Sequence, residues 1–155
     1  YQGDGYDKMG ATFSSCGYTA TPVRSGKYWC TFEVFDAYNL AGFKGLSRGA
    51  HAYVITMQRW WPKQAGYVYV DYGRSNHVTA LQRVKPGFAV FFNSIYGSDA
   101  GREHVALVHQ ISVDSRGNGS LKTLDANGSS KTATYTIRGW NVQVVWNSIA
   151  SFGGH

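Results

Sequence analysis

Residues 30–41 have the sequence CTFEVFDAYNLA, in which apolar side chains recur at the spacing of one helix face. The apolar stripe consists of Cys30, Val34, Ala37, Tyr38 and Ala41. Gly42 follows the stripe, and glycine is the residue that most often ends a helix. The stretch therefore predicts an amphipathic helix that begins at Cys30 and packs its apolar side on a core.

A second helix is expected over residues 50–61. Pro62 ends it, because proline cannot donate the backbone hydrogen bond that a helix interior requires. The residues on its inner side are Ala50, Val54 and Met57. Residues 1–28 are rich in Gly, Ser, Thr and Tyr without periodicity, so they predict an irregular N-terminal arm, and the core is expected over residues 29–148.

After Gly66 the pattern changes to short runs of β-branched and aromatic residues separated by Gly and Asn, which is typical of antiparallel strands. The expected strands cover residues 67–71, 88–93, 104–112, 120–126, 133–137 and 142–147. The sequence DSRGNGS at 114–120 predicts a hairpin turn. Helices followed by strands indicate an α+β fold, with N-terminal helices packed against a C-terminal antiparallel sheet of about five to six strands.

Length and composition predict one globular domain over residues 1–155. Hydrophobic residues make up 43% of the chain and charged residues only 15%, which favours a packed core over disorder. The formal charge of +6 favours polyanionic partners, but the basic residues do not cluster and no nucleic-acid-binding motif occurs, so nucleic acid is not expected. No apolar stretch is long enough to span a bilayer.

Cys30, at the start of the first expected helix, is the candidate nucleophile. The positive end of a helix favours a thiolate in its first turn, and the backbone N–H there can hold a developing oxyanion. His104 stands at the start of its strand, where it can take the thiol proton and later protonate the leaving amine. The next strand carries Asp125 and Asn127 on one face, and either can orient the imidazole.

Four segments stand out by their order along the chain: YWCTFEVFDAYN (28–39), KPGFAVFF (85–92), EHVALVHQI (103–111) and LDAN (124–127). Together they resemble the CHAP family of cysteine, histidine-dependent amidohydrolases/peptidases, relatives of the NlpC-type papain-like hydrolases. The resemblance implies a papain-like α+β core and, as usual substrates, the peptide stems or cross-bridges of bacterial peptidoglycan. No cofactor and no metal site are expected.

Carried over by position, Cys30 matches the nucleophile of this family and His104 matches its histidine. Asp125 stands where the family usually has Glu, and Asn127 matches the Asn two residues later, so the third triad member stays open between them. In related NlpC-type enzymes a tyrosine upstream of the cysteine points into the site. That tyrosine would be Tyr18, and the candidate substrate-binding or oxyanion residues are Tyr18 and Trp29, which directly precedes Cys30.

Other motifs compete with this interpretation or add to it. Residues 45–49, GLSRG, match the G-x-S-x-G of a serine-hydrolase elbow, but no strand leads into them, so Ser47 is expected to be a helix N-cap. His109 faces away from His104 and is expected to be a packed or surface histidine. The aromatic candidates for a sugar-peptide groove, which core packing explains equally well, are Trp60, Trp61, Tyr67 and Tyr69.

The residues thus predict a peptidoglycan hydrolase that cleaves an amide bond, either as an N-acetylmuramoyl-L-alanine amidase or as a stem or cross-bridge endopeptidase. We expect a monomer that is secreted or attached to the cell wall, or else a phage lysin, and that is part of a larger multidomain protein or a processed chain. One alternative is a non-catalytic wall-binding or adhesion module with a disulfide between Cys16 and Cys30. A second is a papain-like effector that acts on protein.

Overall fold

The computed structural model describes residues 30–43, 54–71, 77–94, 104–125, 131–142 and 146–155. Its helical elements are α3 (Cys30–Leu40), α4 (Val54–Trp60), the 3-10 helix η2 (Trp61–Lys63) and α5 (His77–Gln82). Its strands are β1 (Val68–Asp71), β2 (Ala89–Ser94), β3 (His104–Val113), β4 (Asn118–Asp125), β5 (Lys131–Arg138), β6 (Asn141–Val142) and β7 (Trp146–Gly154). The described residues form an antiparallel sheet of seven strands with few helices, which agrees with the expected α+β class in coarse outline and has more strands than expected.

Helix α3 begins and ends close to where its apolar stripe predicts. Cys30, Val34 and Tyr38 are buried, whereas Ala41 lies beyond the helix end and is exposed. The Phe43 N–H donates to the Tyr38 carbonyl at 2.9 Å, the bond that closes a Schellman motif. Gly42 adopts the left-handed φ of 87° that this motif needs, so its expected role as the stop residue is confirmed.

Within the described residues the second helix ends one residue before its expected end, since α4 covers Val54–Trp60 and Trp61 begins the 3-10 helix. Residues 50–53 of the expected helix lie outside the described residues. Met57 is fully buried, as expected for its inner side. Pro62 ends the α-helical pattern, since it falls in the 3-10 turn of η2.

Trp61 is a core residue and not part of an exposed groove. It is fully buried, its indole N–H donates to the Gly154 carbonyl at 3.0 Å, and its ring lies where a Cβ on Gly153 would stand. The groove interpretation is therefore wrong for Trp61. The other three aromatic candidates, Trp60, Tyr67 and Tyr69, are half-buried.

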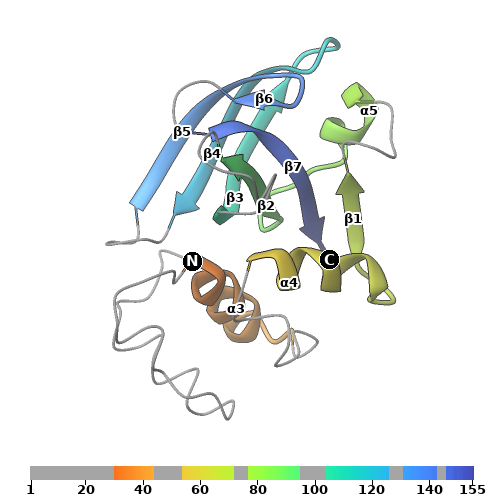
Figure 1. Cartoon of the computed structure of the whole chain (residues 1–155), viewed down its shortest axis with the longest axis vertical. Helices are drawn as coiled ribbons and strands as arrows, with labels where there is room; N and C mark the ends of the chain where they lie inside the picture. The colour runs from red at the N-terminus through yellow and green to blue at the C-terminus, as the bar shows by residue number, and fades with distance from the viewer. Residues whose placement is uncertain (1–29, 44–53, 72–76, 95–103, 126–130, 143–145) are drawn as a thin grey trace.

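The strands close into a ring. The order across the sheet is β1-β7-β2-β3-β4-β5-β6, every neighbouring pair is antiparallel, and β6 also pairs with β7 through Asn141 and Ser148. Strands β7, β2, β3, β4, β5 and β6 thus form a closed strand ring, and β1 extends the sheet beyond β7. Figure 1 shows the curled strands above helices α3 and α4, with α5 beside β1.

The central strands are buried on both faces. In β3, Val105 and Leu107 pack outward against α3 and α4, and Ala106 and Val108 pack into the strand ring. This double burial explains why the strand has a continuous apolar run in place of an alternating pattern. The inner core is filled by large side chains from every side of the ring, including Phe92, Leu121, Ile137, Ile149 and Phe152.

The C-terminal part of the chain differs most from expectation. The single strand expected over residues 142–147 is two strands, and β7 continues to Gly154, past the expected core boundary at residue 148. Ile149 and Phe152 of this strand are buried in the ring, because β7 lies between β1 and β2. Helix α5 was not expected at all.

The expected hairpin between β3 and β4 is confirmed. Asp114 Oδ1 accepts hydrogen bonds from the backbone N–H groups of Arg116 and Asn118 at 2.8 and 2.9 Å, and Gly117 takes a positive φ. The two N–H donors also lower the pKa of the Asp114 carboxyl. A β-bulge between Val108 and Gln110 then shifts the register by one residue, and this shifted register puts Asp125 at the end of β4 on the same face as His104 at the start of β3.

None of the helices in the described segments combines the length and the apolar character needed to cross a bilayer.

Candidate active site

The thiol of Cys30 stands at the first residue of α3. The cysteine is free, and its exposed fraction is only 2%. The first N–H groups of a helix have no intrahelical acceptor, and the partial positive charge at this end favours anions. The start of α3 therefore brings the Cys30 thiol and backbone N–H donors to one place.

His104 and Asp125 lie at the same end of two neighbouring strands. Strand β3 begins at His104, and β4, which runs antiparallel to it, ends at Asp125. The register pairs Leu107 with Leu124, so Asp125 stands diagonal to His104 on the inner face of the ring. His104 Nε2 lies 2.7 Å from Asp125 Oδ1, and both side chains are buried. The two strands thus form a His–Asp pair shielded from water.

The imidazole of His104 links Asp125 to Cys30. Besides the bond from Nε2 to Asp125, the ring has a side-chain hydrogen bond with Cys30. Because Nε2 is engaged with the carboxylate, Nδ1 is the ring nitrogen that remains for the sulfur. Sulfur, imidazole and carboxylate are therefore connected in a chain of three groups, as nucleophilic catalysis by a thiol requires.

The charge state of His104 follows from these contacts. Burial lowers the pKa of the imidazole, but the hydrogen bond with Asp125, the hydrogen bond with Cys30 and the charges of both partners raise it, from an ordinary 6.5 to about 9. The imidazole is therefore protonated at neutral pH. An imidazolium of this kind attracts a neighbouring negative charge and can give its proton to a leaving amine.

Asp125 has further hydrogen-bond donors on the inner face. The Thr123 hydroxyl donates to Oδ2, and the Tyr135 hydroxyl donates to Oδ1 at 3.3 Å. Phe92 stacks on the imidazole of His104, with ring centroids 6.0 Å apart and an interplanar angle of 17°. The carboxylate is thus held at both oxygens, and the histidine ring is held at one face.

The structure brings together three of the predicted site residues, Cys30, His104 and Asp125. The other three, Asn127, Tyr18 and Trp29, lie outside the described residues, as do the G-x-S-x-G motif at 45–49 and Cys16. His109, expected to be either packed or at the surface, is exposed. Across the described ranges, no group of three or more His, Cys, Asp or Glu side chains is arranged to hold a metal ion.

Sequence reasoning missed Thr123, Tyr135 and Phe92. A signal existed for Thr123, because residues two apart on a strand share a face and Thr123 stands two before Asp125. Tyr135 comes from β5, and only the pairing of β4 with β5 brings it near the carboxylate. Phe92 pairs directly with His104 across β2 and β3, and no local sequence pattern predicts this pairing.

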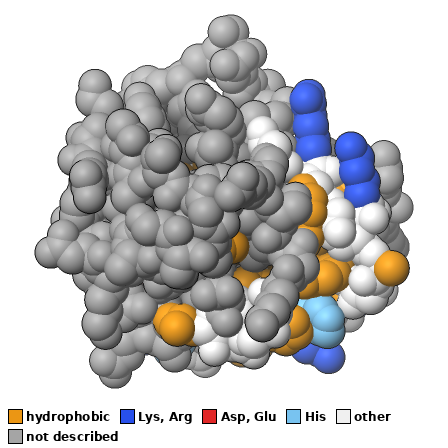
Figure 2. Space-filling view, turned by 90° about the horizontal axis from the view of Figure 1, so that it is seen from below, with side chains coloured by type: hydrophobic (Ala, Val, Ile, Leu, Met, Phe, Trp, Pro, Cys, Tyr) orange, Lys and Arg blue, Asp and Glu red, His pale blue; other side chains and the backbone are white. Residues whose placement is uncertain are grey.

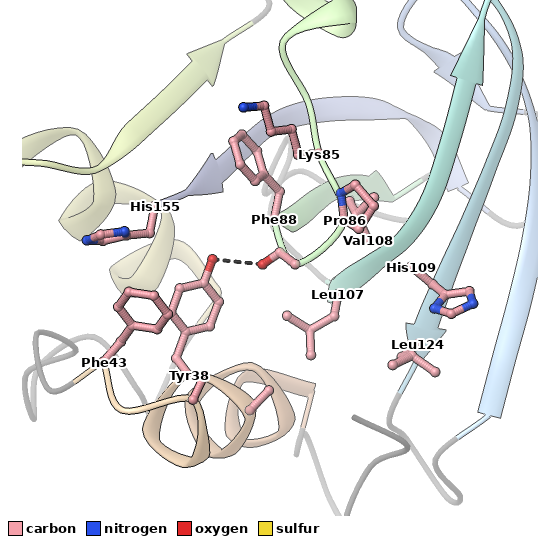
Figure 3. Close-up of a pocket in the computed structure, with 13 residues that line it drawn as sticks. Tyr38, Phe43, Lys85, Pro86, Phe88, Leu107, Val108, His109, Leu124 and His155 are labelled. Carbon is pink, nitrogen blue, oxygen red and sulfur yellow. Dashed lines mark hydrogen bonds between the residues drawn. The ribbon is translucent and has the colours of Figure 1, made fainter.

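A cavity of about 430 Å³ lies on the outer side of the sheet, between α3 and strands β3 and β4. Its lining is formed by Ala37, Tyr38, Ala41, Phe43, Lys85, Pro86, Gly87, Phe88, Leu107, Val108, His109, Leu124 and His155. Figure 3 shows the Tyr38 hydroxyl pointing to the Gly87 carbonyl, to which it donates at 2.8 Å, and burial raises the pKa of this tyrosine. Cys30, His104 and Asp125 are not among the lining residues, so the cavity is separate from the triad.

Lys or Arg side chains lie on the described part of the surface on the α3 side. Figure 2 shows this side of the molecule, with hydrophobic side chains next to Lys or Arg and a His, and no Asp or Glu of the described residues is visible on it. This agrees with the formal charge of +6 for the whole chain.

No family model, curated protein or solved structure matches the chain. Function is therefore inferred from the geometry of Cys30, His104 and Asp125.

Proposed function

We propose that the chain is a cysteine amidohydrolase or peptidase of the CHAP kind with a papain-like catalytic arrangement, and that it hydrolyses an amide bond of bacterial peptidoglycan. The observation that carries this proposal is the connected series of buried side chains from Cys30 through His104 to Asp125. A thiol at a helix start, an imidazole in contact with it and a carboxylate behind the imidazole form the set of groups that acyl transfer through a thioester needs.

The reaction has two halves. The Cys30 thiolate attacks the amide carbonyl carbon, and the resulting tetrahedral oxyanion is held by backbone N–H groups that include that of Cys30 at the helix start. The C–N bond then breaks as His104 gives its proton to the leaving amine, which leaves an acyl thioester on the sulfur. Water next attacks the thioester carbonyl and passes a proton to His104, so that the carboxylic acid leaves and the ion pair is restored.

Asp125 supports both halves by holding the imidazole. Its Oδ1 accepts the Nε2–H of His104, which fixes the ring so that Nδ1 faces the sulfur. The carboxylate charge also stabilises the imidazolium that waits for the leaving amine. Asp125 is therefore our choice as the third member of the triad.

Two observations support peptidoglycan as the substrate. The four segments described above resemble a family that acts on this polymer, and the chain carries a formal charge of +6, which favours an anionic cell wall. Action on this substrate requires that the protein be secreted to the wall or released as a phage lysin.

The test is hydrolysis of purified peptidoglycan by the full chain, followed by turbidity and by mass spectrometry of the released fragments. Cys30→Ala and His104→Ala are expected to lower the rate by at least about 10⁴-fold, as loss of a nucleophile or its base does. His109→Ala is the matched control, because His109 lies on the same strand but is exposed, and it is expected to keep the wild-type rate. Hydrolysis by Cys30→Ala at the wild-type rate would refute the proposal.

The same experiment separates the alternatives. The fragments released distinguish an amidase, which frees the amino group of the first stem residue, from an endopeptidase, which frees one within the stem or cross-bridge. Cleavage of casein with no muropeptides would point to an effector that acts on protein. The non-catalytic binding module with a disulfide is disfavoured because Cys30 is free. A thiol titration of the native protein that finds no reactive thiol would support that module after all.

A further inference from the structure

Asp125 accepts hydrogen bonds from two side chains besides His104. Its Oδ1 accepts from His104 Nε2 and from the Tyr135 hydroxyl, and its Oδ2 accepts from the Thr123 hydroxyl. Rotation of an aspartate carboxylate about its χ2 torsion meets only a low barrier. A carboxylate with a single hydrogen-bond partner can therefore rotate and lose that hydrogen bond. Donors at both oxygens fix the plane of the carboxylate.

The two extra donors reach Asp125 by different routes. Thr123 stands two residues before Asp125 on β4, and its hydroxyl therefore lies on the same inner face. Tyr135 pairs with Leu121 across β4 and β5, so its side chain leans along the strands toward the carboxylate. Thr123 is fully buried and Tyr135 is half-buried, so the ring encloses both hydroxyls at least in part.

Phe92 connects the same group of side chains to the histidine. Its fully buried ring stacks on His104 on one side and lies 5.3 Å from the ring of Tyr135, tilted by 52°. A shift of Tyr135 would therefore disturb the support of both the carboxylate and the imidazole. The inner face of the strand ring thus carries a connected set of side chains behind His104 and Asp125.

We propose that Tyr135 and Thr123 are positioning residues, which hold the Asp125 carboxylate in the plane in which it can orient His104 toward Cys30. The inference rests on the proposed thiol mechanism, but it also predicts a property of the free protein that needs no substrate. Loss of the Thr123 hydroxyl removes the donor at Oδ2, and loss of the Tyr135 hydroxyl removes one of the two donors at Oδ1, so either change holds the carboxylate less firmly against His104 while the fold is retained.

The expected effects can be stated for each hydroxyl. A hydrogen bond to a charged group is worth about one pKa unit, which corresponds to about tenfold in an equilibrium. Thr123→Val, which removes the donor at Oδ2, is expected to lower the pKa of His104 and to lower kcat about tenfold with little change in KM, and Tyr135→Phe, which removes the longer of the two bonds at Oδ1, is expected to have the same effects to a smaller extent. Thr123→Ser keeps a hydroxyl at the same position and is expected to retain the wild-type values.

The experiment measures Cys30 alkylation by iodoacetamide between pH 5 and pH 10 by mass spectrometry, alongside an NMR titration of the His104 ring. The matched controls are Tyr38→Phe, which removes a hydrogen-bonded tyrosine hydroxyl outside the triad, and Thr134→Val, which changes an exposed threonine on β5. Both controls are expected to keep the wild-type pH profiles. Thermal unfolding of every variant establishes that the fold is intact.

The outcomes separate the two proposals. A shift of the His104 titration to lower pH together with slower alkylation of Cys30 at neutral pH in Tyr135→Phe and Thr123→Val, but not in the controls, supports the positioning role, because a weaker imidazolium stabilises the thiolate less. Profiles equal to those of Tyr38→Phe and Thr134→Val overturn it, and so does a Thr123→Ser profile that shifts as far as that of Thr123→Val. Peptidoglycan hydrolysis that is insensitive to Cys30→Ala overturns the proposed function instead, whatever the pH profiles show.

Discussion

Replacement of Asp125 by Asn is expected to change how the stability of the protein depends on pH. The pKa of His104 is raised from 6.5 to about 9 in the folded chain. A difference of this size corresponds to about 3 kcal/mol, at about 1.4 kcal/mol per unit. Because the folded pKa lies above the unfolded one, this stabilisation is fully present below pH 6.5 and is lost as the pH rises through 9.

Asp125→Asn removes two of the causes that raise the pKa of His104, namely the hydrogen bond to the carboxylate and its charge. It leaves burial, which lowers the pKa, and the hydrogen bond and charge of Cys30, which raise it. The pKa of His104 is therefore expected to fall from about 9 toward 6.5. Most of the stability change of about 3 kcal/mol between pH 6 and pH 9.5 then disappears in the variant, because folded and unfolded states bind the proton alike.

Two measurements check this prediction: NMR titration of the His104 imidazole and urea unfolding at pH 6 and pH 9.5, for the wild type and for Asp125→Asn. His104→Gln serves as a control, since it removes the titrating group itself and is expected to give the same flat dependence. The reasoning is refuted if Asp125→Asn loses as much stability as the wild type over this pH range, or if its His104 still titrates near pH 9.

Two further predictions concern the fold. Gly119→Ala is expected to destabilise the protein by about 1–3 kcal/mol in chemical unfolding, because the added Cβ would overlap the backbone carbonyl of Ser112 on the paired strand. Ser120→Ala, at an exposed neighbouring position, is the control. Equal stability of the two variants would contradict the register of β3 on β4. Phe152→Ala is expected to lower the free energy of unfolding by about 3–5 kcal/mol, because it empties a fully buried site beside Trp140 in the strand ring, and a loss below about 1 kcal/mol would speak against a closed inner core.

The sequence predicted the elements whose signals are local. The stripe from Cys30 to Tyr38 and the stop at Gly42 define α3, since helix periodicity and a left-handed cap depend only on neighbours in the chain. The turn from Asp114 to Gly117 was predictable for the same reason, because its hydrogen bonds join residues two to four apart. The strands were predicted to within a few residues up to β5.

The part played by the C-terminal strand was not predictable from local pattern. Strand β7 inserts between β1 and β2, although β1 and β2 are nearer to each other in the sequence than either is to β7. Trp61 is buried because Gly153 of this strand leaves room for its ring and the Gly154 carbonyl accepts its indole N–H. Such partners depend on pairing between distant segments, which periodicity does not encode.

The candidate site, too, was predictable from the sequence only in part. Residue type and position on an element were enough to single out Cys30, His104 and Asp125, because a helix start and the ends of strands can be recognised along the chain. Only the register of β3 on β4, and of β4 on β5, decided that Asp125 contacts His104 and that Tyr135 stands behind it. The physical reason is that a strand's faces alternate by a local rule, whereas its neighbour and its register are chosen by the packing of the whole ring.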